Sequence, residues 1–218
     1  MAEHDEEQIE ALRRWWQENG RSVIAGIVIG LGALGGWSGW NWYQNEQALA
    51  ASAIYEDVLG GLEQGDYTAV REGASNLRDD YGGTVYAALG ALAGARAAVE
   101  EGDLERAHEW LRWTVEEGEG AELTSIARAR LARVVAAQGN ADEALALLDA
   151  EVPAAFNGLF AEVRGDILTQ QGERAAAADA YRQALDAEGP VSDPEMVRRK
   201  LDRLSGADNG AGRQSAAS

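Results

Sequence analysis

The sequence predicts an all-α protein in which a single transmembrane helix near the N-terminus precedes a solenoid of helical hairpins. Three observations predict this fold class: an uncharged apolar run of membrane-spanning length, glycine turns at a nearly constant interval, and alanine and leucine at helical spacing. Val, Ile and Thr do not alternate with polar residues over any long stretch, as half-buried strands require.

The apolar run extends from Val23 to Trp42 and reads VIAGIVIGLGALGGWSGWNW, with no charged residue. About 20 helical residues suffice to cross a hydrocarbon core of about 30 Å. A cleaved signal peptide is the alternative, because small residues in an A-x-A spacing follow the run. The segment before the run is long and acidic, however, and the run exceeds the roughly 7–15 apolar residues of a signal peptide. We therefore expect an uncut anchor over residues 22–43.

Positive charge precedes this run and is lacking just after it. Arg13, Arg14 and Arg21 come before it, whereas no Lys or Arg occurs from residue 44 to 70. The Lys/Arg bias near a span sets its orientation. Residues 1–21 are therefore expected to form a cytoplasmic tail with a short amphipathic helix, and the rest of the chain to lie on the outer side.

Residues in and around the run predict two kinds of contact. Amphipathic rings favour the headgroup layer, so a membrane-interface position is predicted for Trp15, Trp16, Trp37, Trp40 and Trp42. Glycines at four-residue intervals permit close contact between helices in membranes. We expect a helix-packing face, on a partner helix or a second copy, from Gly26, Gly30, Gly32, Gly35, Gly36 and Gly39.

The composition excludes several functions. With 37 Asp+Glu against 19 Lys+Arg, the net charge of −18 repels nucleic acid. A salty habitat and plain solubility both remain as reasons for this acidity. The sequence has no cysteine, and its two histidines, His4 and His108, are not in a catalytic or zinc-binding pattern. No phosphate-binding loop or dinucleotide fingerprint occurs either. We therefore expect a non-enzymatic protein without a cofactor or a metal.

Glycine turns divide the region after the run into repeats. Gly65, Gly102, Gly139 and Gly172 follow one another at spacings of 37, 37 and 33 residues. Seven residues before the last three turns stand Ala95, Ala132 and Gly165. Small residues at these places let two antiparallel helices approach closely. The period and this layout resemble the tetratricopeptide repeat; a plain bundle of helical hairpins is the alternative.

The repeat region is expected to span residues 44–204. Ser192-Asp193-Pro194 predicts the start of a final helix, which would cap the solenoid. Residues 205–218 are rich in Gly, Ala and Ser, and we expect a disordered tail.

The first helices of the hairpins predict a binding groove. In tetratricopeptide folds these helices line a concave surface, on which two stacked arginines over apolar residues could grip a carboxylate or an extended backbone. The candidate groove residues are Leu89, Leu92, Arg96, Ile126, Arg133 and Asp166. The alternative is that each arginine merely pairs with a nearby glutamate.

The segment from Ile9 to Gln47 is similar to the start of the ancillary subunit of the bacterial Sec translocon. The motif EALRRWWQENG and the glycine-rich span ending in tryptophans carry this likeness. The segment YGGTVYAAL, which begins at Tyr81, and the closing helix with Lys200-Leu201 also fit. The likeness covers nearly the whole chain.

The resemblance implies a single-pass protein of the bacterial inner membrane with its C-terminal domain in the periplasm. It implies a scaffold that associates with translocon channel subunits and a membrane-anchored periplasmic chaperone of the prolyl-isomerase-like type, and that assists exported proteins. A cytoplasmic response regulator is a further implied partner. The alternative is a periplasmic adaptor for envelope assembly, stress signalling or division machinery, unrelated to secretion.

Overall fold

The computed structural model describes residues 2–189 and 191–215, although several side chains before residue 34 and those after Leu204 lie outside this description. Every regular element in these ranges is helical, as the sequence predicts. The elements are α1 (Ala2–Gln64), α2 (Tyr67–Tyr81), α3 (Val85–Glu100), α4 (Leu104–Glu117), α5 (Ala121–Ala137), α6 (Ala141–Leu147), the 3₁₀ turn η1 (Ala154–Phe156), α7 (Asn157–Gln171), α8 (Arg174–Asp186) and α9 (Pro194–Ser215).

The chain divides into two compact units, Met1–Gln47 and Ala48–Ser218. Within the described part of the chain, no helix is both long and apolar enough to cross a membrane. The predicted anchor over residues 22–43 is thus not confirmed, and the side chains of Val23, Ile27 and Ile29 within it lie outside the description.

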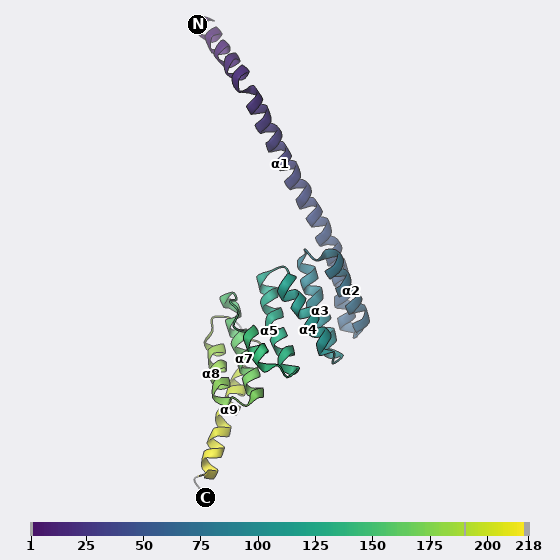
Figure 1. Ribbon diagram of the computed structural model, residues 1–218, viewed down its shortest axis with the longest axis vertical. Coiled ribbons are helices and arrows are strands. Elements are labelled where there is room, and N and C mark those ends of the chain that lie inside the picture. Colours follow the sequence, from purple (N-terminus) through teal and green to yellow (C-terminus); the bar gives the residue numbers. More distant parts are fainter. Residues whose placement is uncertain (1, 190, 216–218) are drawn as a thin grey trace. The chain divides into compact units, whose positions relative to one another are not determined.

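The second unit, which we call the repeat domain, consists of helices that pack against their neighbours in chain order (Figure 1). The turns between them contain the predicted glycines, all with positive φ: 71° at Gly65, 78° at Gly102, 93° at Gly139 and 82° at Gly172. Only glycine adopts this left-handed backbone without strain. These four residues therefore fix where one helix ends and the next begins.

Close approach of paired helices depends on small residues, as the sequence predicts. Ala95 and Ala132 are buried in the main core cluster. At Gly165 a Cβ atom would lie only 2.6 Å from the ring of Tyr181, so α7 and α8 could not pack as they do with a side chain there. The repeat domain thus has the alternation of small and large residues that its sequence period indicates.

The last helix begins as the sequence predicts. The Asp193 carboxylate accepts hydrogen bonds from the backbone N–H groups of Glu195 and Met196, which caps α9. Val197 and Leu204 on this helix are buried in a cluster with residues of α8. The prediction of a disordered tail falls on residues 205–218, whose side chains are outside the description, and it stays a prediction.

Candidate functional site

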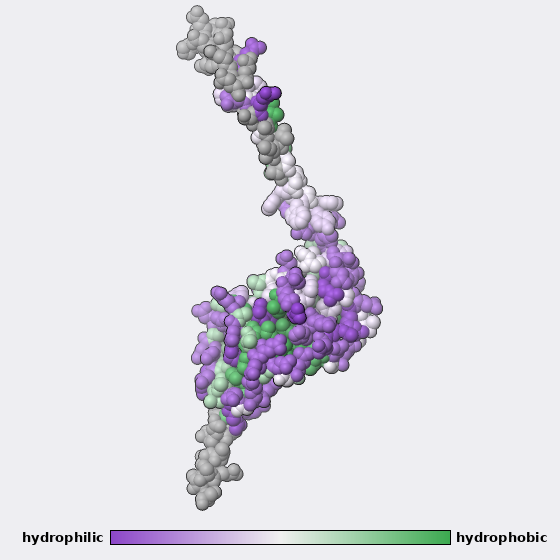
Figure 2. Space-filling model, in the orientation of Figure 1, coloured by the Kyte–Doolittle hydropathy of each residue, from purple (hydrophilic) through white to green (hydrophobic). Residues whose placement is uncertain are grey.

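The first candidate site is a hollow of about 390 Å³ between α3, α4 and α5. Leu92, Leu111 and Val134 are among its apolar lining residues, and Arg96 and Arg133 are among the charged ones. Figure 2 shows apolar side chains gathered on this part of the repeat domain, bordered by hydrophilic ones. The hollow therefore combines an apolar floor with cationic groups.

Three of the six predicted groove residues meet in this hollow: Leu92, Arg96 and Arg133. Leu89 and Ile126 are half-buried and are not among its lining residues. The sixth, Asp166, lines a neighbouring hollow, where it contacts Arg133. The equivalent repeat positions are thus brought near one another, but not along one uniform surface.

Arg130 belongs to the first hollow and was missed at the level of sequence. Burial lowers its pKa below the ordinary value, and the positive charges of Arg133 and Arg96 lower it further. Three like charges are therefore close enough to repel one another. The signal was present in the sequence, because Arg130 and Arg133 are three residues apart and share a helix face.

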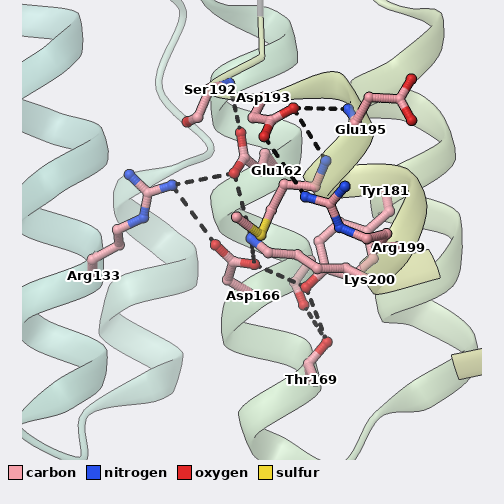
Figure 3. A network of polar contacts seen from close by, with 12 residues as sticks. Arg133, Glu162, Asp166, Thr169, Tyr181, Ser192, Asp193, Glu195, Arg199 and Lys200 are labelled. Atoms are coloured by element: carbon pink, nitrogen blue, oxygen red, sulfur yellow. Dashed lines mark hydrogen bonds and ion pairs between the residues drawn. The ribbon is translucent and has the colours of Figure 1, made fainter. Parts of the chain in front are cut away.

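The second hollow, of about 550 Å³, lies among α5, α7, α8 and α9. Beside it, Glu162 is only 3% exposed, and its carboxylate accepts hydrogen bonds from the backbone N–H of Ser192 at 2.9 Å and from Lys200 Nζ at 3.4 Å. Lys200 also donates to Asp166 at 2.6 Å, and Tyr181 donates to the same carboxylate at 2.8 Å (Figure 3). These contacts join α7 and α8 to the capping helix α9.

Tyr181 is nearly fully buried in this network. Burial raises its pKa to about 12, and the hydrogen bond to Asp166 and the negative charges of Asp166 and Glu162 act in the same direction, whereas the hydrogen bond with Thr169 opposes them. The neutral phenol is therefore the form that the fold requires.

The alternative that the groove arginines merely pair with acidic residues holds for one of them. Arg133 lies 3.8 Å from Glu162 and 3.7 Å from Asp166 (Figure 3). Both distances exceed those of a charge-assisted hydrogen bond. Within the described residues, Arg96 and Arg130 make no ion pair. Two of the three arginines in the first hollow thus retain unpaired charge.

The residues predicted to contact the membrane or a partner helix lie on α1. The tryptophans Trp15, Trp16, Trp37, Trp40 and Trp42 are all exposed. A Cβ atom added at Gly26, Gly30, Gly32, Gly35, Gly36 or Gly39 would meet no atom within 4 Å outside the local helix backbone. Among the described residues, no close contact accounts for the lack of a side chain at these six positions.

Comparison with known proteins identifies the family. Residues 13–206 match the family described as tetratricopeptide repeat-like domain. The chain is 31% identical over 200 residues to the ancillary SecYEG translocon subunit of Haemophilus influenzae, covering 92% of this chain and 97% of that protein. The chain belongs to the ancillary Sec translocon subunit family.

Two further relatives agree with this assignment. The ancillary SecYEG translocon subunit of Escherichia coli is 29% identical over 206 residues, which cover 93% of this chain and 98% of that protein. Its Neisseria gonorrhoeae counterpart is 29% identical over 211 residues, covering 94% and 100%. The resemblance read from the sequence to this family of ancillary translocon subunits is confirmed, as is the tetratricopeptide-like repeat.

Proposed function

We propose that this protein is a non-enzymatic scaffold, anchored in the bacterial inner membrane by one helix, that associates with the Sec translocon and assists exported proteins in the periplasm. The observation that carries the proposal is the match to ancillary translocon subunits over nearly the full length of both chains. Such coverage includes the N-terminal segment as well as the repeats.

The composition of α1 supports a membrane anchor. The run from Val23 to Trp42 has no charge, and basic residues precede it. Within a protein that occupies water alone, exposed aromatic side chains at Trp37, Trp40 and Trp42 would be costly. The proposal therefore assigns the run to the membrane, the tail before it to the cytoplasm and the repeat domain to the periplasm.

Two surfaces support two kinds of partner. The open glycine face of α1 suits close packing against helices of the channel subunits. The hollow with Arg96, Arg130 and Arg133 suits part of an extended chain. We assign to the repeat domain a membrane-anchored periplasmic chaperone of the prolyl-isomerase-like type and emerging exported chains, and to the cytoplasmic tail a response regulator.

Site-specific photocrosslinking in intact membranes tests this proposal. Crosslinkers at Gly30 and Gly36 are expected to capture channel subunits, and one at Arg133 is expected to capture the chaperone or an exported chain. Matched crosslinkers at Arg112, which is exposed on α4, and at Gly60 serve as controls. If positions 30 and 36 capture no channel subunit and position 133 captures neither periplasmic partner, the proposal is wrong.

A second candidate is a periplasmic adaptor for envelope assembly, stress signalling or division machinery. This hypothesis also requires a membrane anchor and a binding groove, because an adaptor would use both to hold its partners at the membrane. The crosslinking experiment separates the two functions: under the adaptor hypothesis, captured proteins belong to the envelope machinery and channel subunits are absent.

A further inference from the structure

The two hollows of the repeat domain adjoin at one residue. Arg133 lines the hollow between α3, α4 and α5, and it also lines the hollow among α5, α7, α8 and α9. Arg133 therefore borders both a hollow with several aliphatic lining residues and a hollow lined largely by polar and charged residues. A ligand that occupied both hollows would pass Arg133.

The charge of this joined surface is opposite to that of the protein. Six cationic side chains line the two hollows, against the carboxylates of Glu100 and Asp166, although the whole chain has a net charge of −18. The cationic residues are Arg96, Arg130, Arg133, Arg174, Lys200 and Arg203. A local excess of positive charge in an acidic protein attracts negatively charged groups and not positive ones.

Several of these arginines have N–H groups that are not engaged in ion pairs. Within the described residues, Arg96, Arg130 and Arg174 make no ion pair with a carboxylate. Arg133 approaches Glu162 and Asp166 only to 3.8 and 3.7 Å, beyond the range in which its N–H groups donate well. A planar guanidinium binds a carboxylate through two parallel hydrogen bonds, so these arginines suit acidic side chains.

The apolar lining of the first hollow favours a ligand that also carries aliphatic side chains. Leu92, Val99, Leu104, Leu111 and Val134 are part of its lining. Burying an aliphatic side chain of a ligand there removes apolar surface from water, which favours binding. The matching partner therefore presents carboxylates next to aliphatic side chains, which is the chemistry of an acidic, partly apolar peptide.

We propose that the two hollows form one binding site for an extended acidic segment of another protein. Its aliphatic side chains enter the first hollow, and its carboxylates bind Arg96, Arg130 and Arg133 and then the cations of the second hollow. This inference rests on the proposed binding role of the groove and specifies its ligand. The capping helix α9 takes part in binding, because Lys200 and Arg203 lie on it.

Fluorescence anisotropy with the full-length chain in a neutral detergent tests this inference. The probe is a short labelled peptide in which Glu alternates with Leu, and its counterpart carries Gln in place of Glu. The Glu peptide is expected to bind roughly tenfold or more tightly than the Gln peptide, and added salt is expected to reduce the difference. Equal affinity for the two peptides would overturn the preference for acidic segments.

Single arginine variants locate the site. Arg130→Gln and Arg174→Gln are each expected to weaken binding of the Glu peptide roughly threefold to tenfold. Arg128→Gln removes the same charge from the same helix as Arg130, but Arg128 lines neither hollow; this control is expected to leave binding unchanged. An equal loss with Arg128→Gln would show general attraction to the protein surface and would overturn the site.

Two outcomes separate this inference from the proposed function. If photocrosslinking at Arg133 captures periplasmic partners while the Gln peptide binds as well as the Glu peptide, the groove binds chains but the acidic preference is wrong. If phosphatidylglycerol vesicles compete with the Glu peptide in an Arg130-dependent manner, the cations bind lipid headgroups, and the peptide proposal is wrong.

Discussion

The glycines from Gly26 to Gly39 on α1 and the glycines at the helix contacts of the repeat domain all lie in helices, but their surroundings differ. A Cβ atom at Gly90 would lie 2.6 Å from Leu77, and one at Gly165 would lie 2.6 Å from Tyr181. A Cβ atom at Gly30 or Gly36 would meet nothing within 4 Å. Gly90 and Gly165 therefore make room for side chains of the same chain, whereas around Gly30 and Gly36 no described side chain occupies that space.

This difference shows where contacts within the repeat domain account for the presence of glycine in a helix. Glycine within a helix costs about 0.5–1 kcal/mol relative to alanine. In the repeat domain, close packing offsets this cost. Among the described residues, nothing around the glycines from Gly26 to Gly39 offsets it; the proposed packing against an external helix would supply that contact. The comparison thus supports an outside partner for α1.

The largest change in the free energy of unfolding is expected when a side chain is added at a closely packed glycine of the repeat domain. Gly165→Val places two further methyl groups where a Cβ already meets the Tyr181 ring, so the free energy of unfolding should fall by about 3 kcal/mol or more. Gly35→Val on α1 is the matched variant, and it should leave the unfolding of the repeat domain unchanged. Thermal or denaturant unfolding followed by circular dichroism measures both. An equal loss of unfolding free energy in the two variants would show that the surroundings of these two glycines do not differ in the way described.

The stability of the repeat domain at alkaline pH tests the role of Tyr181, whose ring packs against Gly165. The pKa of Tyr181 is raised from 10.0 to about 12, so the neutral phenol stabilises the fold. This contribution is fully present below pH 10 and is lost as pH rises through about 12; the loss reaches about 2–3 kcal/mol. Tyr181→Phe should remove this part of the pH dependence. Unfolding free energies of both proteins between these pH values give the measurement, and parallel curves would contradict the assignment.

The smallest change in the free energy of unfolding is expected when alanine replaces a glycine of the repeat domain that has no close neighbour. At Gly60 a Cβ atom would meet only the end of the Gln64 side chain, at 3.7 Å. Gly60→Ala should therefore raise the free energy of unfolding by up to about 1 kcal/mol, through helix propensity alone. A destabilised variant would mean that the surroundings of this glycine, and not its backbone freedom, decide the outcome.

The sequence predicted those parts of the fold that depend on local rules. Gly102 and Gly139 mark turns because left-handed backbone favours glycine, and Asp193 caps α9 because its carboxylate reaches two backbone N–H groups. The spacing of small residues also predicted how close α7 and α8 lie. Such features need only residues that are near one another in the chain.

The network around Glu162 could not be predicted in this way. It joins residues of α5, α7, α8 and α9, and the contact between Glu162 and Lys200 spans 38 positions of the chain. Such contacts depend on how successive hairpins stack, which the repeat period alone does not fix. Arg130 differs, because its distance of three residues from Arg133 was enough to place both on one face.

We propose that the glycine face of α1 recognises helices of the translocon channel. The most direct measurement is co-purification of channel subunits, from membranes in mild detergent, with the double variant Gly32→Leu/Gly36→Leu. The control is Leu31→Ile/Leu34→Ile, which changes side-chain shape on the same helix. Recovery of channel subunits is expected to fall roughly tenfold with the glycine variant. Recovery with the control variant, and the unfolding of the repeat domain in both variants, should remain as in the unaltered protein. Undiminished recovery of channel subunits with the glycine variant would contradict it.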